Sequence, residues 1–533
     1  MNLARVVSWR SLMKLMALLV VSIYGAGAPP LKTAQVQGPN GILEGVISAD
    51  DKVRTFKGIP YAAPPVGPLR WTEPKSAQSW SGVRRATEYG ARCMQGPIYA
   101  DMVFHDEGPS EDCLYLNLWM PAHPASDKLP VMVWIYGGGF NAGSTSEPRQ
   151  DGGNLSKQGV IVVSMNYRLG IFGFFSYPEL AKESGHDSAG NYGLLDQVAA
   201  LKWVHANIAL FGGDPGNVTI FGESAGASSV SALIASPLAK GLFQRAIGES
   251  GAALNATRPV VSLAQSEETN MRFAREAFGT TSIEELRSKP AAEILAAALK
   301  AKDVHFSINV DGYFLPESPV AIYSSGKQSP VPLLAGWNAD EGSARAVFGD
   351  KAATAANLQV ELRRLYPGDA DEAIQLYPAQ TDEQAKRAAE ELSRDRGVGC
   401  TMWKWLEWQR KTGAATTYRY EFDRARPSPP GAAGPDLEPR AYHSAEIEYV
   451  FSTVPYGAAP WPQEDRALAQ LMSTYWANFA KTGDPNGPGL PQWPVYNSER
   501  GAEVMYFNVE SKASPDRSQA RYRFITGWGA VKQ

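Results

Sequence analysis

The segment "NVTIFGESAGASSVSALIA" (217–235) joins an apolar strand pattern to a run of small residues typical of a helix. Between the two, Gly222 and Gly226 flank Ser224 in the pattern G-x-S-x-G. A strand, a tight turn and a helix in this order present the central serine at the carboxyl end of a strand. Ala225 would open the helix, where a free N–H and the helix dipole favour an anion. The segment therefore predicts a nucleophilic serine at the edge of a sheet.

Other short β-rich runs surround this segment. They are "VMVWIY" (131–136), "VIVVSMN" (160–166), "VPLLAGW" (331–337) and "TTYRYEF" (416–422). Several of them are nearly continuous apolar stretches, as expected of buried parallel strands. The segment 194–211, by contrast, repeats its apolar residues at helical spacing. Strands that alternate with helices predict an α/β fold with a mostly parallel central sheet, covered by helices on both faces.

The triplet Gly-Glu-Ser occurs a second time, in "QRAIGESGAAL" (244–254). Here the second glycine, Gly251, follows Ser250 directly, one position too early for G-x-S-x-G. The sequence after it is a poor helix. We therefore expect Ser250 to be a hydrogen-bonding residue at a strand end and Ser224 to be the nucleophile.

A serine hydroxyl needs a base, and the base needs an orienting carboxylate. A nucleophile in this context is followed along the chain first by the acid and then by the histidine. Four of the six histidines precede Ser224, and His305 leaves little room for an acid. His443, in "AYHSAEIEYVF", is therefore the expected base. Asp340 and Glu341 both follow the strand pattern at 331–337, and the pattern does not separate them.

The stretch "VWIYGGGF" (133–140) runs from a strand straight into Gly137, Gly138 and Gly139. Backbone N–H groups in such a loop can bind the oxyanion of a tetrahedral intermediate. A phosphate-binding loop is the alternative, but no lysine follows the glycines and the Walker pattern is absent.

Composition limits the remaining classes of function. The 533-residue chain has a net charge of −4 and no basic run beyond its N-terminus, which argues against a nucleic-acid partner. Its length alone would suggest about three or four domains. The three cysteines, Cys93, Cys113 and Cys400, show no zinc-type spacing. We expect no metal and no cofactor, and we expect Cys400 to be a buried thiol.

The first 28 residues have basic, apolar and small-residue regions in the order of an export signal. The apolar run at 15–23 is short for a membrane span. An uncleaved anchor or a disordered terminus is the alternative. A secreted or periplasmic protein without a stable membrane span is the expectation.

Seven ordered blocks make the chain from about Gly41 onward resemble the type-B carboxylesterase family, which includes cholinesterases, mammalian carboxylesterases and bacterial para-nitrobenzyl esterases. The blocks are "FKGIPYAAPPVGPLRW" (56–71), "EDCLYLNLWMP" (111–121), "YGGGF" (136–140), "SAGNYGLLDQ" (188–197), "FGGDPGNVTIFGESAGA" (211–227), "NADEGS" (338–343) and "HSAEIEYVF" (443–451). The resemblance is strongest to the bacterial branch.

This resemblance implies one α/β-hydrolase domain at 36–533 with large insertions, in place of several domains. It also assigns roles to individual residues. Ser224 is implied as the nucleophile, Glu341 rather than Asp340 as the acid, His443 as the base, the N–H groups of Gly138, Gly139 and Ala225 as oxyanion donors, Ser250 as a residue behind the triad, and Cys93 and Cys113 as a disulfide pair.

The activity implied is hydrolysis of small-molecule carboxylic esters through an acyl-enzyme. A specialised hydrolase of a bulky natural-product or xenobiotic ester, amide or carbamate is one alternative. An inactive adhesion protein of the same fold is another, although such proteins lose the triad. The segment 93–113 contains no tryptophan of the kind that cholinesterases stack on choline, so recognition of that cation is not expected. The sequence gives no indication of the oligomeric state.

Overall fold

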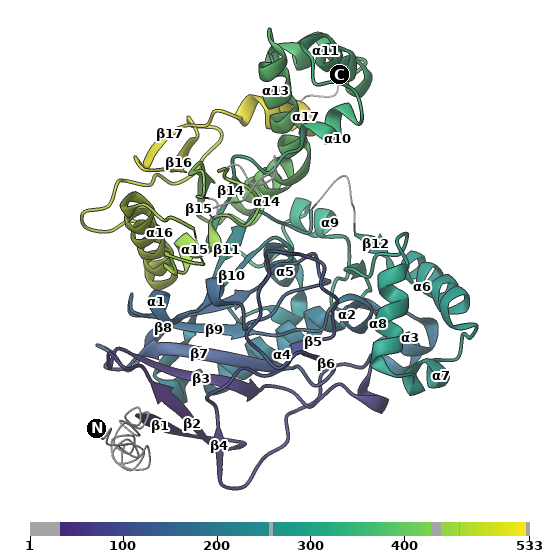
Figure 1. Ribbon diagram of the computed structural model, residues 1–533, viewed down its shortest axis with the longest axis vertical. Coiled ribbons are helices and arrows are strands. Elements are labelled where there is room, and N and C mark those ends of the chain that lie inside the picture. The colour runs from purple at the N-terminus through teal and green to yellow at the C-terminus, as the bar shows by residue number, and fades with distance from the viewer. Residues whose placement is uncertain (1–31, 255–259, 428–438, 458, 529–533) are drawn as a thin grey trace, which may run out of the picture.

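The computed structural model describes residues 32–254, 260–427, 439–457 and 459–528, so the predicted export signal at 1–28 lies outside the described residues. Its centre is a 13-stranded sheet (Figure 1). In spatial order the strands are β1 (Thr33–Gly38), β2 (Gly41–Ile47), β3 (Val53–Pro60), β7 (Tyr115–Pro121), β9 (Ile161–Met165), β8 (Leu129–Ile135), β10 (Gly213–Glu223), β11 (Arg245–Glu249), β14 (Leu333–Asn338), β15 (Thr417–Phe422), β16 (Glu503–Phe507) and β17 (Lys512–Pro515), with β4 (Val83–Arg85) beside β2.

The middle of the sheet, from β9 to β16, is parallel throughout. Antiparallel strands extend it at both edges. Every residue of β9, β14 and β15 is buried, which agrees with the largely apolar sequences of β9 and β14. Strand β15 differs, because it also buries the charged residues Arg419 and Glu421. The prediction of a mostly parallel sheet is confirmed.

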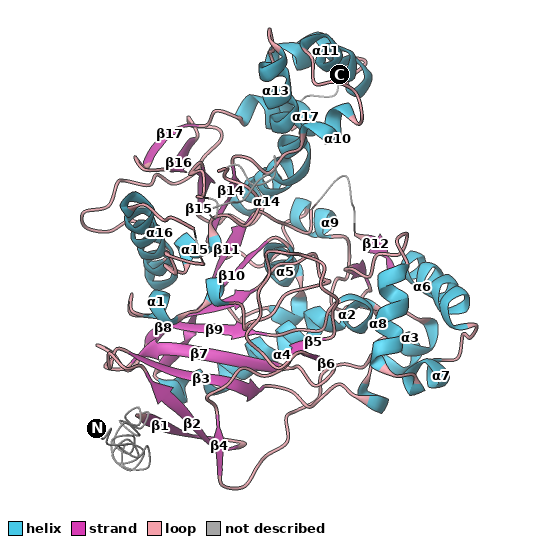
Figure 2. Ribbon diagram, viewed as in Figure 1, coloured by secondary structure: helices cyan, strands magenta, loops and turns pink. Residues whose placement is uncertain are grey.

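Helices cover both faces of the parallel strands (Figure 2). On one side lie α1 (Gly153–Ser156), α15 (Ile447–Val450) and α16 (Gln463–Thr482); on the other lie α4 (Tyr192–Asn207), α5 (Ala225–Ala235) and α14 (Cys400–Lys411). The helix expected at 194–211 corresponds to α4 and the 3₁₀ turn Ile208–Phe211 that continues it.

Two long insertions interrupt the alternation of strands and helices. The first, between β11 and β14, contains β12 (Val261–Ser262), α6 (Leu263–Phe278), α7 (Ile283–Ser288), α8 (Ala291–Lys300), β13 (Asn309–Val310) and α9 (Pro319–Ser324). The second, between β14 and β15, contains α10 (Ala344–Phe348), α11 (Ala355–Leu365), α12 (Ala370–Leu376), α13 (Asp382–Arg394), a π-helical turn (Asp395–Gly399) and α14. Helices α10 to α13 enclose a small hydrophobic cluster of their own.

The remaining elements are short: α2 (Gly170–Phe174), α3 (Pro178–Ser184), α17 (Gln519–Thr526), β5 (Arg92–Cys93) and β6 (Pro109–Ser110), with 3₁₀ turns at Gly67–Leu69, Pro148–Gln150 and Pro237–Ala239. Within the ranges given above, the structure contains no helix with the length and apolarity needed to cross a membrane.

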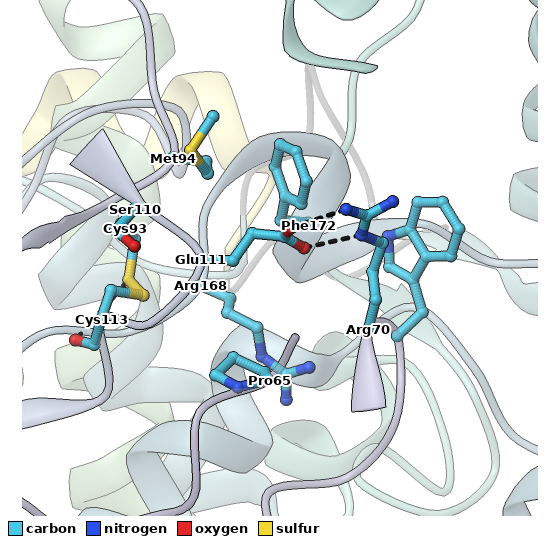
Figure 3. A pocket seen from close by; sticks show the side chains of 10 residues that line it. Pro65, Arg70, Cys93, Met94, Ser110, Glu111, Cys113, Arg168 and Phe172 are labelled. Carbon is cyan, nitrogen blue, oxygen red and sulfur yellow. Dashed lines mark hydrogen bonds and ion pairs between the residues drawn. A yellow bond between two sulfur atoms is a disulfide. The ribbon is translucent and has the colours of Figure 1, made fainter. Parts of the chain in front are cut away.

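A disulfide bond joins Cys93 to Cys113, and Cys400 is a buried free thiol. Figure 3 shows a largely buried ion pair beside this disulfide. The guanidinium of Arg70 donates two hydrogen bonds of 2.6 Å to the two carboxylate oxygens of Glu111. Its remaining nitrogen donates to three carbonyls at the end of α7, those of Leu286, Arg287 and Lys289. The pair therefore fastens the base of the segment 93–113, the disulfide loop, to the first insertion.

Replacing Arg70 with Met is expected to lower the free energy of unfolding by about 3 kcal/mol, because it leaves the largely buried Glu111 carboxylate without its partner. Equilibrium urea unfolding measures the loss. The matched control is Arg345→Met, which breaks the pair with Asp350 where both side chains are more than four-fifths exposed (82% and 94%). That variant should stay within about 0.5 kcal/mol of the parent, and equal losses in the two variants would contradict the argument.

Candidate active site

Ser224 lies in a strained turn between β10 and α5. Its backbone has φ 56° and ψ −118°, a positive φ that is uncommon for a residue other than glycine. Two hydrogen bonds hold the turn: the Ser224 N–H donates to the Glu249 carbonyl at 2.8 Å, and the Ser228 N–H donates to the Ser224 carbonyl at 2.9 Å. The strand–turn–helix predicted from the sequence therefore presents Ser224 just beyond the carboxyl end of β10.

Glycines allow neighbouring chains to approach this turn closely. A Cβ atom on Gly226 would lie 1.9 Å from the Ile135 carbonyl oxygen, at the end of β8. A Cβ atom on Gly251 would lie 2.0 Å from the Ser224 carbonyl oxygen. No side chain fits at either position, so the glycine after Ser250 serves the packing of the Ser224 turn.

His443 bridges Ser224 and Glu341, which come from distant parts of the chain. Its Nε2 atom lies 2.8 Å from the Ser224 Oγ, and its Nδ1 atom lies 3.4 Å from the Glu341 Oε1. The Glu341 carboxylate is itself held in place, since Oε1 also accepts the Asn338 N–H at 3.2 Å and the Ser250 hydroxyl at 2.5 Å. Three segments far apart in sequence thus meet at one imidazole.

Asp340, the other carboxylate of the predicted pair, has a different partner. It forms two hydrogen bonds with Ala441, because its N–H donates to the Ala441 carbonyl and its Oδ2 accepts the Ala441 N–H, both at 2.9 Å. Asp340 therefore ties the turn after β14 to the segment that carries His443. Of the two neighbours, Glu341 is the one that contacts the imidazole.

The glycine loop lies directly against the Ser224 turn. A Cβ atom on Gly137 would be 2.9 Å from the Ser224 Cβ. Gly138 and Gly139 follow with φ of 106° and 62°, backbone conformations that favour glycine. Within the described part of the chain, no group accepts a hydrogen bond from the N–H of Gly138, Gly139 or Ala225. Three backbone donors are thus available next to the serine hydroxyl.

Ser250 directly follows β11 and contacts the Glu341 carboxylate that faces the imidazole of His443. Its hydroxyl is 2.5 Å from the Glu341 Oε1 and 3.5 Å from the Glu446 Oε1. Glu446 in turn accepts a 2.5 Å hydrogen bond from the side-chain amide of Asn338. Within the described residues Ser250 has no hydrogen bond with His443 and reaches it only through the Glu341 carboxylate.

Glu223 and Arg149 also belong to this site, and the sequence reasoning missed both. The Glu223 carboxylate is buried, and its Oε1 lies 3.2 Å from the Nε2 of His443. Arg149 is buried as well, paired with Glu147 at 2.5 Å, and one of its nitrogens lies 3.3 Å from the hydroxyl of Ser444, the neighbour of His443. Glu223 is part of the Gly-Glu-Ser triplet, but the triplet does not indicate that this carboxylate faces the histidine.

Buried carboxylates dominate the electrostatics around the imidazole. Burial raises the pKa of Glu223 to about 7, against the opposing effects of His443 and Arg149. Burial, together with Glu223 and Glu341, raises the pKa of Glu446 to about 8. For His443, partial burial lowers the pKa, but the negative charges of Glu223 and Glu341 outweigh it and hold the pKa above its usual range. Because the His443 side chain is 49% exposed, solvent screens part of this effect.

Comparisons with known proteins identify the family of this chain. The model of the "Carboxylesterase family" matches residues 32–525. A fumonisin B1 esterase of Sphingopyxis macrogoltabida is 36% identical over 515 residues, which cover 91% of this chain and 89% of the esterase. The liver carboxylesterase of Sus scrofa is 37% identical over 538 residues, covering 91% of each chain.

Solved structures lead to the same family. A PNB esterase structure superposes with a TM-score of 0.77 at 33% sequence identity, covering 92% of this chain and 99% of the esterase. The fold is thus the α/β-hydrolase fold of carboxylesterases, as the motifs implied. The chain belongs to the carboxylesterase family, whose members hydrolyse carboxylic esters.

Proposed function

We propose that the protein hydrolyses esters through an acyl-enzyme formed on Ser224, with His443 as general base and Glu341 as the orienting acid. The observation that carries this proposal is the imidazole of His443, which lies 2.8 Å from the Ser224 hydroxyl and 3.4 Å from the Glu341 carboxylate. An intact contact of this kind also disfavours the inactive adhesion protein.

The proposed reaction has two halves. In the first, the Nε2 of His443 takes the Ser224 proton while Oγ bonds to the carbonyl carbon. The N–H groups of Gly138, Gly139 and Ala225 hold the oxyanion, and the imidazolium then protonates the departing alcohol. In the second half, Nε2 takes a proton from water, the hydroxide bonds to the acyl carbon, and the carboxylic acid leaves as Ser224 regains its proton. Glu341 stabilises the imidazolium in both halves.

Labelling with a fluorophosphonate tests the assignment, because this reagent bonds to an activated serine and blocks it. Peptide mass spectrometry of the labelled protein should find the adduct on Ser224, and turnover of para-nitrophenyl butanoate should fall in step with labelling. An adduct on Ser250 would reverse the assignment. Labelling of neither serine by an active protein would reject the acyl-enzyme.

Replacing Glu223 with Gln is expected to move the acidic limb of the kcat/KM profile to lower pH. Activity needs the neutral imidazole, so kcat/KM rises as pH passes through the pKa of His443. The charge of Glu223 raises the pKa of His443. Without this charge the acidic limb should shift to lower pH by about one unit, equivalent to about 1.4 kcal/mol. The control is Asp350→Asn at an exposed carboxylate, which should leave the limb in place. A limb that stays fixed or rises in Glu223→Gln would contradict this account.

We also propose that the protein is exported to the periplasm or the medium and that residues 36–533 form one domain. The order of basic, apolar and small residues at 1–28 supports export. The disulfide between Cys93 and Cys113 is of the kind that persists in oxidising compartments. Cell fractionation of the native host, with N-terminal sequencing of the active protein, tests this. Activity confined to the cytosol with an intact N-terminus would reject it.

A further inference from the structure

The disulfide loop lies against the glycine loop and is fastened to the segment that follows it. The side-chain amide of Gln95 donates to the Gly143 carbonyl at 2.8 Å and accepts the Gly143 N–H at 2.9 Å. Farther along the loop, the Asp101 carboxylate lies 3.5 Å from the guanidinium of Arg149. The disulfide closes the base of the loop. The loop therefore keeps a fixed position relative to the glycines.

Two side chains of this loop flank the proposed oxyanion donors. The Tyr99 hydroxyl is 3.1 Å from the position that a Cβ atom on Gly139 would take. The Met102 methyl carbon is 3.2 Å from the corresponding position on Gly138. An ester carbonyl that accepts hydrogen bonds from these two amides would therefore lie next to a phenol and a thioether.

The Tyr99 hydroxyl is available to a ligand. The residue is 43% exposed, and among the described residues its hydroxyl has no hydrogen-bond partner. Burial of the other part of the ring, with the charges of Glu223 and Asp101, raises the pKa of Tyr99, so the hydroxyl keeps its proton and remains a donor at neutral pH.

The oxyanion itself already has three donors in the N–H groups of Gly138, Gly139 and Ala225, which is as many as such an oxygen usually accepts. We infer that Tyr99 is a specificity-determining residue that donates a hydrogen bond to a second oxygen of the substrate, close to the scissile carbonyl. The preferred substrates are then esters with an ether, hydroxyl or oxo oxygen near that carbonyl. This inference rests on the proposed function of the same site.

A binding site that offers a hydrogen bond discriminates strongly against analogues that lack the partner atom. The test compares Tyr99→Phe with the parent on two pairs of esters that match in shape. The first pair, para-nitrophenyl methoxyacetate and para-nitrophenyl butanoate, differs only in an acyl-side oxygen. The second pair, 2-methoxyethyl acetate and butyl acetate, differs only in an alcohol-side oxygen.

In Tyr99→Phe, kcat/KM should fall about tenfold for the oxygenated ester of at least one pair and less than about twofold for both hydrocarbon esters, since tenfold corresponds to about 1.4 kcal/mol. The pair that responds identifies the side of the substrate that Tyr99 contacts. Ile98→Ala, a change at a neighbouring exposed residue of the loop, serves as the control and should leave the ratio within each pair unchanged.

Two outcomes would overturn the inference. Equal losses for both members of each pair would place the Tyr99 hydroxyl on the oxyanion instead, and no loss for any ester would remove Tyr99 from the substrate site. Neither outcome would contradict the proposed function. That function is tested separately, by the turnover of para-nitrophenyl butanoate by the parent and by the labelling of Ser224.

Discussion

Replacing Ser224 with Ala is expected to lower kcat on para-nitrophenyl butanoate by about 10⁵- to 10⁶-fold. The hydroxyl forms the covalent bond to the acyl group, and among the described residues Ser224 is the one hydroxyl within hydrogen-bond distance of the His443 imidazole, at 2.8 Å. What remains is the contribution of the backbone donors and of substrate binding. Rapid-mixing kinetics check the same point, because formation of the acyl-enzyme releases one para-nitrophenol per enzyme molecule. This burst should be present in the parent and absent in the variant.

Ser250→Ala is the matched control, since both serines follow Gly-Glu and both have a positive φ. Ser250 bonds to the Glu341 carboxylate rather than to the imidazole. Its loss removes one supporting hydrogen bond, worth about 1 kcal/mol, so kcat should fall only about fivefold. If Ser250→Ala loses 10⁵-fold or more while Ser224→Ala loses only about fivefold, and both variants fold by circular dichroism, the two serines have been assigned the wrong way round.

Much of the fold could be predicted because its signals are local. The apolar run at 160–166 became the fully buried strand β9, since a parallel strand covered on both faces needs apolar residues at nearly every position. The turn at Ser224 was equally clear, because a strand, two glycines and a helix of small residues leave the backbone few alternatives.

The choice between Asp340 and Glu341 could not be made from pattern alone. Both follow β14, and which carboxylate reaches the imidazole depends on a segment 100 residues later in the chain. There the Ala441 N–H engages Asp340 and leaves Glu341 to face His443. The choice of Glu341 over Asp340 came from the family resemblance, which rests on whole motifs. The residues alone left the choice open.

The repeated triplet shows the same limit for Glu223. Glu223 and Glu249 are the central residues of the two Gly-Glu-Ser triplets, and each is the last residue of a strand and precedes a serine. The first lies 3.2 Å from the Nε2 of His443, and the second accepts a hydrogen bond from the indole of Trp476. Their different roles depend on which distant segment packs against each strand end, and a local sequence pattern carries no information about that packing.

Replacing Glu341 with Gln is expected to lower kcat by about 10⁴-fold while leaving the fold intact. The amide oxygen can still accept the Asn338 N–H and the Ser250 hydroxyl, so the shape of the site is kept. The same oxygen faces Nδ1, so the tautomer of His443 is kept as well. The negative charge is lost, however, and the imidazolium that forms when Nε2 takes the Ser224 proton no longer has its counter-ion.

Asp340→Asn provides the sharp comparison, because it makes the same chemical change one residue earlier. The amide oxygen of Asn can still accept the Ala441 N–H, so the bond that positions the His443 segment survives and kcat should fall less than about tenfold. Single-turnover acylation rates separate the two variants without interference from product release. Because a charge that acts only at long range would affect both variants alike, a loss near 10⁴ in Glu341→Gln alone requires direct contact between carboxylate and imidazole. The reverse order of losses would make Asp340 the catalytic acid and would contradict the geometry described here.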